Sequence, residues 1–257
     1  FVPGREILQR SLRHSPVIHG RIHAAKALLK AGLTTNLNLV HDAFKLEQNS
    51  YVRRQIAKAL SSASQPAAGA VLRQMLATEE HPHVLAELSI SCKSFPSKEM
   101  REALKEFVSR PSIPYRAKGN ALISLGSLGE FVDNESWDIL LSNTRDSGWT
   151  HFIRRQAITA VGGLKSAQAA EQLRIILRSD DQSDKGLSAC CLALGACSRD
   201  LSDGERQKSK EALELALYTP STSVIKSAIM GLQRLNLPSA AAAIERTRHR
   251  LPIQEWP

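Results

Sequence analysis

Apolar residues recur every three or four positions through most of the chain, a spacing that places them on one face of a helix. The segment 152–164, FIRRQAITAVGGL, shows this most clearly, with one apolar face made of Ile153, Ala157, Ile158, Val161 and Leu164. Two arginines stand at the start of the segment, and small residues interleave with its apolar face. The pattern predicts an amphipathic helix that packs its apolar face against a neighbouring element.

The same pattern occurs seven times, at intervals of 32 to 38 residues. The copies align on an anchor position occupied by Arg21, Arg53, Leu85, Lys118, Arg154, Leu187 and Ile225. Three residues after the anchor, every copy is apolar: Ala24, Ile56, Leu88, Ala121, Ala157, Cys190 and Ala228. Seven residues after it, every copy is again apolar: Leu28, Leu60, Cys92, Leu125, Val161, Leu194 and Leu232. The offset of six residues is always small: Ala27, Ala59, Ser91, Ser124, Ala160, Ala193 and Gly231. Such repetition predicts structural repeats that each pack on their neighbours.

A further amphipathic segment precedes each anchored helix, so each repeat is predicted to be a pair of antiparallel helices. These first helices are expected over 5–14, 37–47, 66–77, 98–109, 135–144, 167–178 and 204–218. The second helices are expected to start near 21, 53, 85, 118, 154, 187 and 225, with turn and capping residues such as Asn49 ahead of them. The segment 239–250 predicts a capping helix or half of a further repeat. We therefore expect an all-α solenoid of about seven helix pairs, forming one domain over residues 1–257.

Composition limits the classes of protein that fit this pattern. Aromatic residues make up only 5% of the chain, which is low for one globular core of this size. No apolar run reaches the roughly 18 residues of a membrane-spanning helix, and the N-terminus does not look like a signal peptide. The four cysteines form no CxxC pair, which favours buried thiols in an intracellular, cytoplasmic or nuclear protein. Because the chain does not begin with Met, we expect a fragment of a larger protein.

The net charge of +9 favours an acidic partner. Basic residues gather in the first two anchored helices, at Arg21, Lys26, Lys30, Arg53, Arg54 and Lys58. A solenoid that follows a nucleic-acid duplex should present a basic residue at the same offset in most repeats, and this chain does not. A protein or peptide is therefore favoured over nucleic acid. The residues expected to contact the partner are Lys26, Arg54, Lys58, Trp149 and Arg155.

Arg53 and Arg154, the first members of two Arg–Arg pairs, are predicted to have a structural role. An arginine at the start of a second helix can hydrogen-bond carboxylates or carbonyls in the loops of an adjacent repeat. Trp149, in a loop between helices, either fills a corner between helices or anchors a partner.

Metal sites, cofactor sites and catalytic sites are not indicated by the sequence. His19 and His23 are four residues apart but have no third ligand nearby, and His81 and His83 flank Pro82 in a predicted turn. Cys190, Cys191 and Cys197 have no neighbouring His and are expected to pack in the core. No phosphate-binding, dinucleotide-binding or nucleophile-elbow motif occurs. We expect no enzymatic activity and no cofactor.

The segments YVRRQIAKAL (Tyr51–Leu60) and FIRRQAITAV (Phe152–Val161) resemble the second helix of HEAT repeats, including the PBS-lyase HEAT-like group. The third and sixth copies depart from the pattern, with Leu85 and Leu187 where Arg is expected. The resemblance implies a right-handed superhelix whose second helices line a concave face. It also implies a scaffold or protein-interaction role, with the concave face as binding surface.

A narrower resemblance is to the C-terminal helical region of aminopeptidase-N-type zinc peptidases and their inactive relatives. It is based on the succession GRIHAAKAL, YVRRQIAKAL, YRAKGNALISLGSLG and ESWDILLSNTRDSGWTHFIRRQAITAVGGL. The zinc-binding HExxH motif of that family is absent here. The resemblance implies a non-catalytic accessory domain whose catalytic partner domain lies outside this chain. Partner identity and oligomeric state stay open at the level of sequence.

Overall fold

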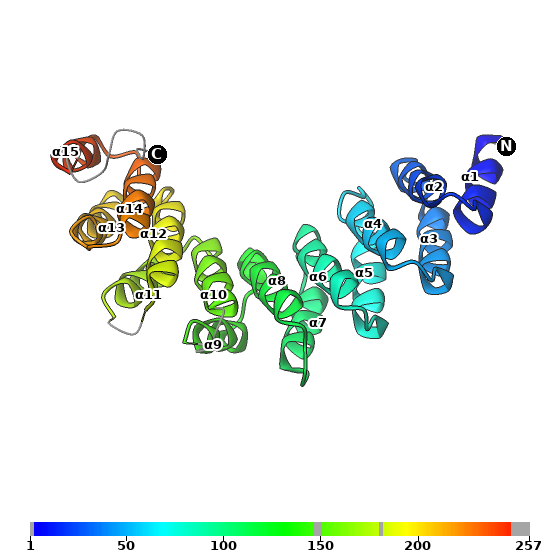
Figure 1. Ribbon diagram of the computed structural model, residues 1–257, viewed down its shortest axis with the longest axis horizontal. Coiled ribbons are helices and arrows are strands. Elements are labelled where there is room, and N and C mark those ends of the chain that lie inside the picture. The colour runs from blue at the N-terminus through cyan, green and yellow to red at the C-terminus, as the bar shows by residue number, and fades with distance from the viewer. Residues whose placement is uncertain (1–2, 146–150, 180–181, 248–257) are drawn as a thin grey trace. The chain divides into compact units, whose positions relative to one another are not determined.

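The computed structural model describes residues 3–145, 151–179 and 182–247. In these residues every regular element is helical (Figure 1). The first helices of the pairs are α1 (Pro3–His14), α3 (Thr34–Leu46), α5 (Ala67–Thr78), α7 (Lys98–Ser109), α9 (Asn134–Asn143), α11 (Ala167–Leu177) and α13 (Asp203–Ala216). The second helices are α2 (Ile18–Lys30), α4 (Ser50–Leu60), α6 (Pro82–Ser91), α8 (Tyr115–Gly126), α10 (Phe152–Gly163), α12 (Asp184–Ser198) and α14 (Thr222–Arg234). Short 3-10 turns, η1 (Cys92–Ser94) and η2 (Gly129–Phe131), follow α6 and α8, and α15 (Pro238–Arg246) follows the seventh pair.

The prediction of an all-α solenoid of about seven helix pairs is confirmed. Each second helix begins two or three residues before its anchor position, and a side-chain cap precedes several of the helices. The Asn49 side chain, for example, accepts hydrogen bonds from the backbone N–H groups of Tyr51 and Val52 at the start of α4. Ser97, Asp133, Ser166, Ser183 and Ser202 cap other helices in the same way.

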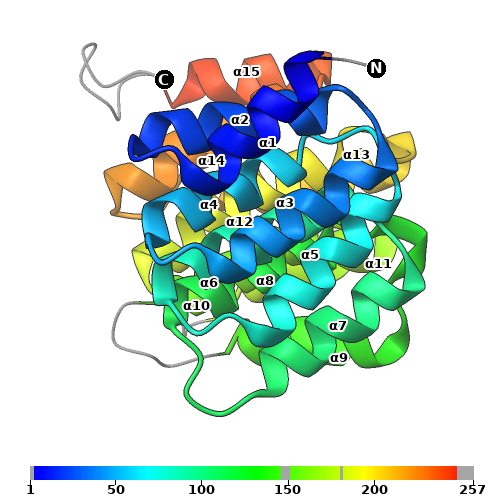
Figure 2. The same ribbon diagram turned by 90° about the vertical axis from the view of Figure 1, so that its right-hand side faces the viewer.

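The chain forms two compact units, Phe1–Phe131 (unit 1) and Val132–Pro257 (unit 2). In unit 1, α2, α4, α6 and α8 pack in succession, and α3, α5 and α7 form a parallel row (Figure 2). In unit 2, α10 packs on α12 and α12 on α14, while α11 packs on α13. The single domain over residues 1–257 stays a prediction, as does the handedness of the superhelix.

The aligned apolar positions form the core. All fourteen residues three and seven positions after the anchor are buried, including Cys92 and Cys190. Small residues at offset six, such as Ser124, Ala193 and Gly231, pack against the second helix of the preceding pair. Ser124 Oγ on α8 donates to the Ser89 carbonyl on α6 at 2.5 Å, and a Cβ atom at Gly231 on α14 would lie 2.6 Å from the Cys191 carbonyl oxygen on α12. Ala27, on the first of these second helices, is exposed.

No helix in the described part of the chain is both long and apolar enough to cross a membrane.

Candidate interaction surface on the second helices

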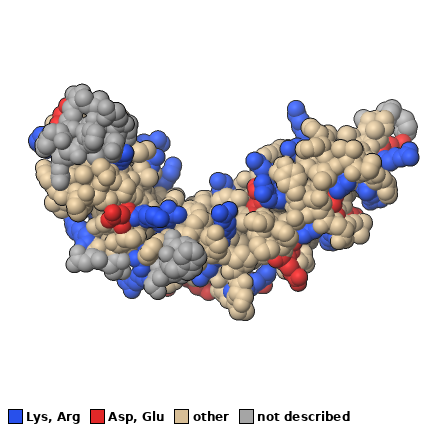
Figure 3. Space-filling model, in the orientation of Figure 1, with Lys and Arg blue, Asp and Glu red and all other residues tan. Residues whose placement is uncertain are grey.

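Acidic residues are nearly missing from the second helices. In unit 1, the described second helices carry one acidic residue, Glu87, against eight basic ones: Arg21, Lys26, Lys30, Arg53, Arg54, Lys58, Arg116 and Lys118. The first helices of the same unit hold five acidic and eight basic residues. Figure 3 shows Lys and Arg side chains along the edge of unit 1 that the second helices form. This edge therefore has a positive charge that few local carboxylates neutralise.

Unit 2 shows the same separation of charge. Its described second helices hold one acidic residue, Asp184, and five basic ones: Arg154, Arg155, Lys185, Lys226 and Arg234. Its first helices hold seven acidic and four basic residues. In both units, therefore, the second helices have a larger excess of basic over acidic residues than the first helices do.

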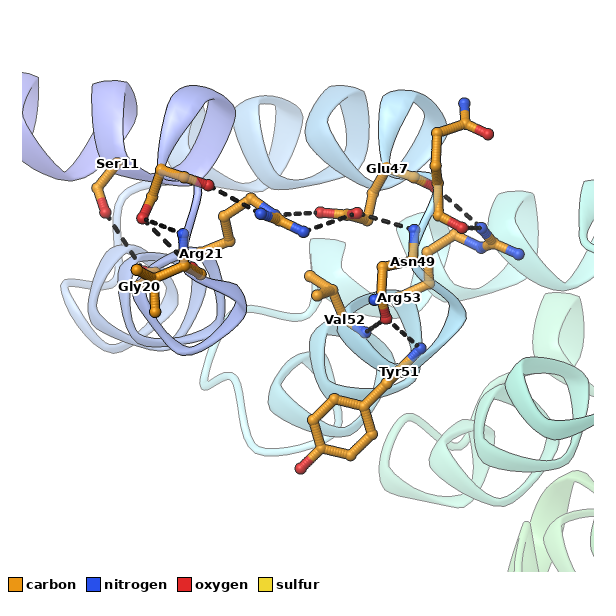
Figure 4. Close-up of polar contacts among 11 residues, drawn as sticks. Ser11, Gly20, Arg21, Glu47, Asn49, Tyr51, Val52 and Arg53 are labelled. Atoms are coloured by element: carbon orange, nitrogen blue, oxygen red, sulfur yellow. Dashed lines mark hydrogen bonds and ion pairs between the residues drawn. The ribbon is translucent and has the colours of Figure 1, made fainter.

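Two of the basic residues in unit 1 are used within the fold. Arg21 donates from Nε and Nη2 to the Glu47 carboxylate at 2.6 and 3.2 Å, and also donates to the Ser15 carbonyl (Figure 4). One repeat later, Arg53 donates to the Glu79 carboxylate at 2.9 and 3.1 Å and to the Glu47 carbonyl. Each arginine thus connects the start of a second helix to the end of the first helix of the next pair. The predicted structural role of Arg53 is confirmed.

Arg154 occupies the same position in unit 2 and is also buried, with 6% of its surface exposed. Its Nη2 donates to the Arg145 carbonyl at 3.2 Å. This acceptor lies in the loop of its own helix pair, whereas the Arg53 carboxylate partner comes from the next pair. In the third repeat the anchor is Leu85, which is buried and cannot make such bonds.

Arg54 extends outward from α4. Its guanidinium lies over the Tyr51 ring at 5.7 Å, and its Nε is 3.8 Å from the Glu87 carboxylate of α6, too far for a hydrogen bond. Figure 4 shows the Tyr51 ring turned away from the Arg21–Glu47 pair and from Arg53, and 46% of Tyr51 is exposed. Tyr51 was not among the contact residues predicted from the sequence.

Lys26 on α2 and Lys58 on α4 lie at the same offset from their anchors, on helices that pack side by side. Both are exposed, and neither has an ion-pair partner among the residues that the structure describes. With Arg54 and Tyr51 they form what we call the unit 1 patch: Lys26, Tyr51, Arg54 and Lys58. The structure therefore brings together three of the predicted contact residues.

The other two predicted contact residues belong to unit 2. Trp149 lies outside the described residues. Arg155, on α10, lines a groove of about 560 Å³ together with Lys165 and with Arg234 of α14. Its guanidinium lies 6.0 Å from the centre of the Phe152 ring. Lys165 and Arg234 were not predicted from the sequence, because nothing local in the chain indicates that they lie beside Arg155.

The histidine and cysteine side chains do not assemble a metal site in the described residues. His81 caps α6, with its Nδ1 accepting from the His83 backbone N–H at 3.3 Å, so Pro82 and His83 lie in the first turn of α6 and not in the predicted loop turn. All four cysteines are free and buried. Burial raises the pKa of Cys92 and of Cys191 to about 12, which keeps both thiols protonated.

Comparison with known families identifies the repeats. The family model for HEAT repeats matches residues 6–91.

Residues 6–91 are therefore similar to HEAT repeats.

Three solved structures align with nearly the whole chain. The complex of CpcE and CpcF of phycocyanin lyase from Nostoc sp. PCC7120 is 18% identical, with a TM-score of 0.52 over 96% of this chain and 94% of that chain. Human deoxyhypusine hydroxylase in complex with glycerol is 17% identical, with a TM-score of 0.45 over 98% and 91%. An engineered protein is 17% identical, with a TM-score of 0.44 over 96% and 72%. No curated protein sequence matches the chain. At these identities the likeness concerns the HEAT-like fold alone.

Proposed function

We propose that this HEAT-repeat chain is a non-catalytic protein-interaction module whose second helices bind an acidic protein surface. The observation that supports the proposal is the near absence of acidic residues from the second helices of both units. Core packing does not require this, because the exposed positions of a helix tolerate either charge. Within each unit, the second helices of successive pairs pack side by side, and a partner can lie on the face that they form.

The unit 1 patch is the proposed contact point in unit 1. Lys26 and Lys58 have no local carboxylate to neutralise them, and Arg54 keeps 42% of its side chain exposed beside Glu87. Tyr51 adds an exposed aromatic surface next to the cations. Arg and Tyr are enriched in the residues that dominate binding energy at protein interfaces. An acidic partner with an apolar or aromatic side chain opposite Tyr51 fits this surface.

The test compares proteins captured by the wild type and by a charge-reversed variant, Arg54→Glu/Lys58→Glu. A matched control is Arg10→Glu/Lys98→Glu, which reverses two exposed charges on the first helices α1 and α7. Both variants change the net charge equally. Capture is done after nuclease treatment, and bound proteins are quantified by mass spectrometry.

The proposal expects acidic proteins that bind the wild type and the control but are depleted at least about tenfold by the second-helix reversal. Equal depletion by both variants would show that net charge alone decides binding. Loss of all capture after nuclease treatment would instead support the nucleic-acid alternative, with a steep salt dependence as its signature.

The relation to aminopeptidase-N-type accessory domains stays a prediction. It is consistent with a non-catalytic role for this chain, because such a domain contributes no zinc ligand. A full-length sequence with an HExxH segment ahead of this region would establish it.

A further inference from the structure

The groove on unit 2 combines a floor of small side chains with a rim of cations. Gly162 and Gly163 of α10 and Ala189, Ala193 and Ala196 of α12 contribute the floor, together with Leu192. Gly162 is fixed by packing, because a Cβ there would lie 2.8 Å from the Ala193 Cβ. Ala196 and Gly163 are exposed instead, so their small size leaves the groove open without serving the contact between α10 and α12.

Three cations surround this floor. Arg155 projects from α10, Lys165 follows the end of the same helix, and Arg234 reaches across from α14, where its Nη1 donates to the Leu192 carbonyl at 3.0 Å. The Arg155 Nε atom is buried and has no hydrogen-bond partner among the described residues. None of the lining residues is acidic. The Asp200 carboxylate, outside the groove lining, lies 3.9 Å from the exposed Lys165 ammonium.

We propose that this groove binds an acidic peptide segment of a partner protein, with small or aliphatic side chains between its carboxylates. Arg155 and Arg234 would each pair with a carboxylate, since a guanidinium suits this group. The Leu192 and alanine floor would cover the aliphatic side chains. Gln156 and Thr159, which also line the groove, supply an amide and a hydroxyl for the peptide backbone. A volume of about 560 Å³ accommodates a few residues of such a segment.

A peptide fits the floor better than a nucleic acid does. A phosphate chain would satisfy the cations but would leave the apolar floor without a complementary surface. Aromatic platforms, on which unpaired bases stack, are not among the groove-lining residues. The groove rests on the proposed function, because α10, α12 and α14 are second helices and the partner is again acidic, but it uses none of the residues of the unit 1 patch.

The test measures fluorescence anisotropy with three defined probes. The first is a short labelled peptide in which Glu alternates with Ala and Leu. The second is a Glu-only peptide with the same number of carboxylates, and the third is a single-stranded DNA oligonucleotide of equal charge. The protein is used as the whole chain, and circular dichroism confirms that each variant is folded.

Four single variants separate the contributions. Arg155→Glu and Arg234→Glu reverse rim charges, Ala196→Trp fills the groove without changing charge, and Arg178→Glu reverses an exposed charge outside the groove on the same unit. We expect the first three to weaken binding of the mixed peptide at least about tenfold, and Arg178→Glu to leave it nearly unchanged. The Glu-only peptide is expected to bind more weakly than the mixed peptide, because it has no aliphatic side chains to pack against Leu192 and the alanines of the groove floor.

The proposal is overturned if the mixed peptide does not bind at low salt. It is equally overturned if Arg178→Glu weakens binding as much as Arg155→Glu, or if the DNA and the Glu-only peptide bind as tightly as the mixed peptide. The Arg54→Glu/Lys58→Glu variant is expected to bind the peptide normally. If the peptide fails to bind while that variant still loses acidic partners, the groove proposal fails and the proposed function stands.

Discussion

Arg53 and Glu79 are joined by two hydrogen bonds, 2.9 Å from Nε and 3.1 Å from Nη2, that connect α4 to the end of α5. Arg21 and Glu47 make the same paired contact one repeat earlier, and both pairs are separated by 26 residues in the chain. Glu79 also accepts hydrogen bonds from the backbone N–H groups of Glu80 and His81, just before α6 begins. Each pair therefore fixes a second helix, the end of the neighbouring first helix and the following turn relative to one another.

Arg53→Ala is expected to lower the free energy of unfolding by about 2 kcal/mol, because the Glu79 side chain is only 6% exposed and its carboxylate would lose both hydrogen bonds from the Arg53 guanidinium. Arg53→Lys should restore only part of this loss, since an ammonium cannot make the paired contact. Urea denaturation followed by circular dichroism measures the change. The control is Arg10→Ala at an exposed position of α1, and its free energy of unfolding should stay within about 0.5 kcal/mol of the wild-type value. An effect of Arg53→Ala as small as that of the control would contradict the structural role.

The Arg53–Glu79 pair should also make stability depend on acid pH. Burial raises the pKa of Glu79, but hydrogen bonds from Arg53 and from the His81 backbone outweigh it, so the pKa lies below its ordinary value of 4.5. A carboxyl with a lowered folded pKa stabilises the fold above its unfolded pKa, and this contribution is lost as the pH falls through the folded value.

The wild type is therefore expected to lose its advantage over Glu79→Gln as the pH falls from 6 to about 3. At neutral pH the wild type should be the more stable of the two. Other carboxyls with lowered pKa values, such as Glu102 and Glu205, are present in both proteins and cancel in the difference. Urea unfolding of both proteins across this pH range measures the gap, and a gap that does not change with pH would refute the linkage.

The fold was predictable because packing repeats itself. The residues three and seven positions after each anchor face the core in all seven copies. One copy alone would predict a helix only weakly, but the agreement of seven copies predicts the repeat reliably. Helix starts were placed two or three residues late, because the repeats align on the anchor position and the helices begin before it, at residues such as Ser50 and Pro82.

The candidate sites were only partly predictable, since they depend on which helices become neighbours. The Arg–Arg pairs indicated that Arg53 is structural, but its partner Glu79 lies 26 residues away in a different helix pair. Arg234 lies 79 residues after Arg155, and only the succession of α10, α12 and α14 places both on one groove. The shortage of acidic residues on second helices was available from the sequence, but it emerges only when acidic and basic residues are counted helix by helix.

Gly231 is predicted to be necessary for the contact between α12 and α14. A Cβ at this position would lie 2.6 Å from the Cys191 carbonyl oxygen and 3.1 Å from Leu213 Cδ2, and the backbone oxygen cannot move without shifting α12. Gly231→Ala should therefore destabilise the protein by about 1 to 3 kcal/mol, although alanine is the better helix former. Gly204→Ala, in open space on α13, is the matched control and should be neutral or slightly stabilising. Thermal unfolding of the two variants tests this, and equal melting temperatures would disprove the close contact.

The four thiols are predicted to be unreactive in the folded protein. All four cysteines are buried, and burial raises the pKa of Cys92 and Cys191 to about 12. At pH 8 only on the order of one thiol in 10,000 is then ionised, and the thiolate is the form that attacks a disulfide reagent. Ellman's reagent should therefore detect almost no thiol in the native protein and all four after denaturation. A Ser62→Cys variant, which places a thiol at an exposed position, should react fast and serves as the positive control. Rapid reaction of a native cysteine would mean that its helix opens, and single Cys→Ser variants would identify which one.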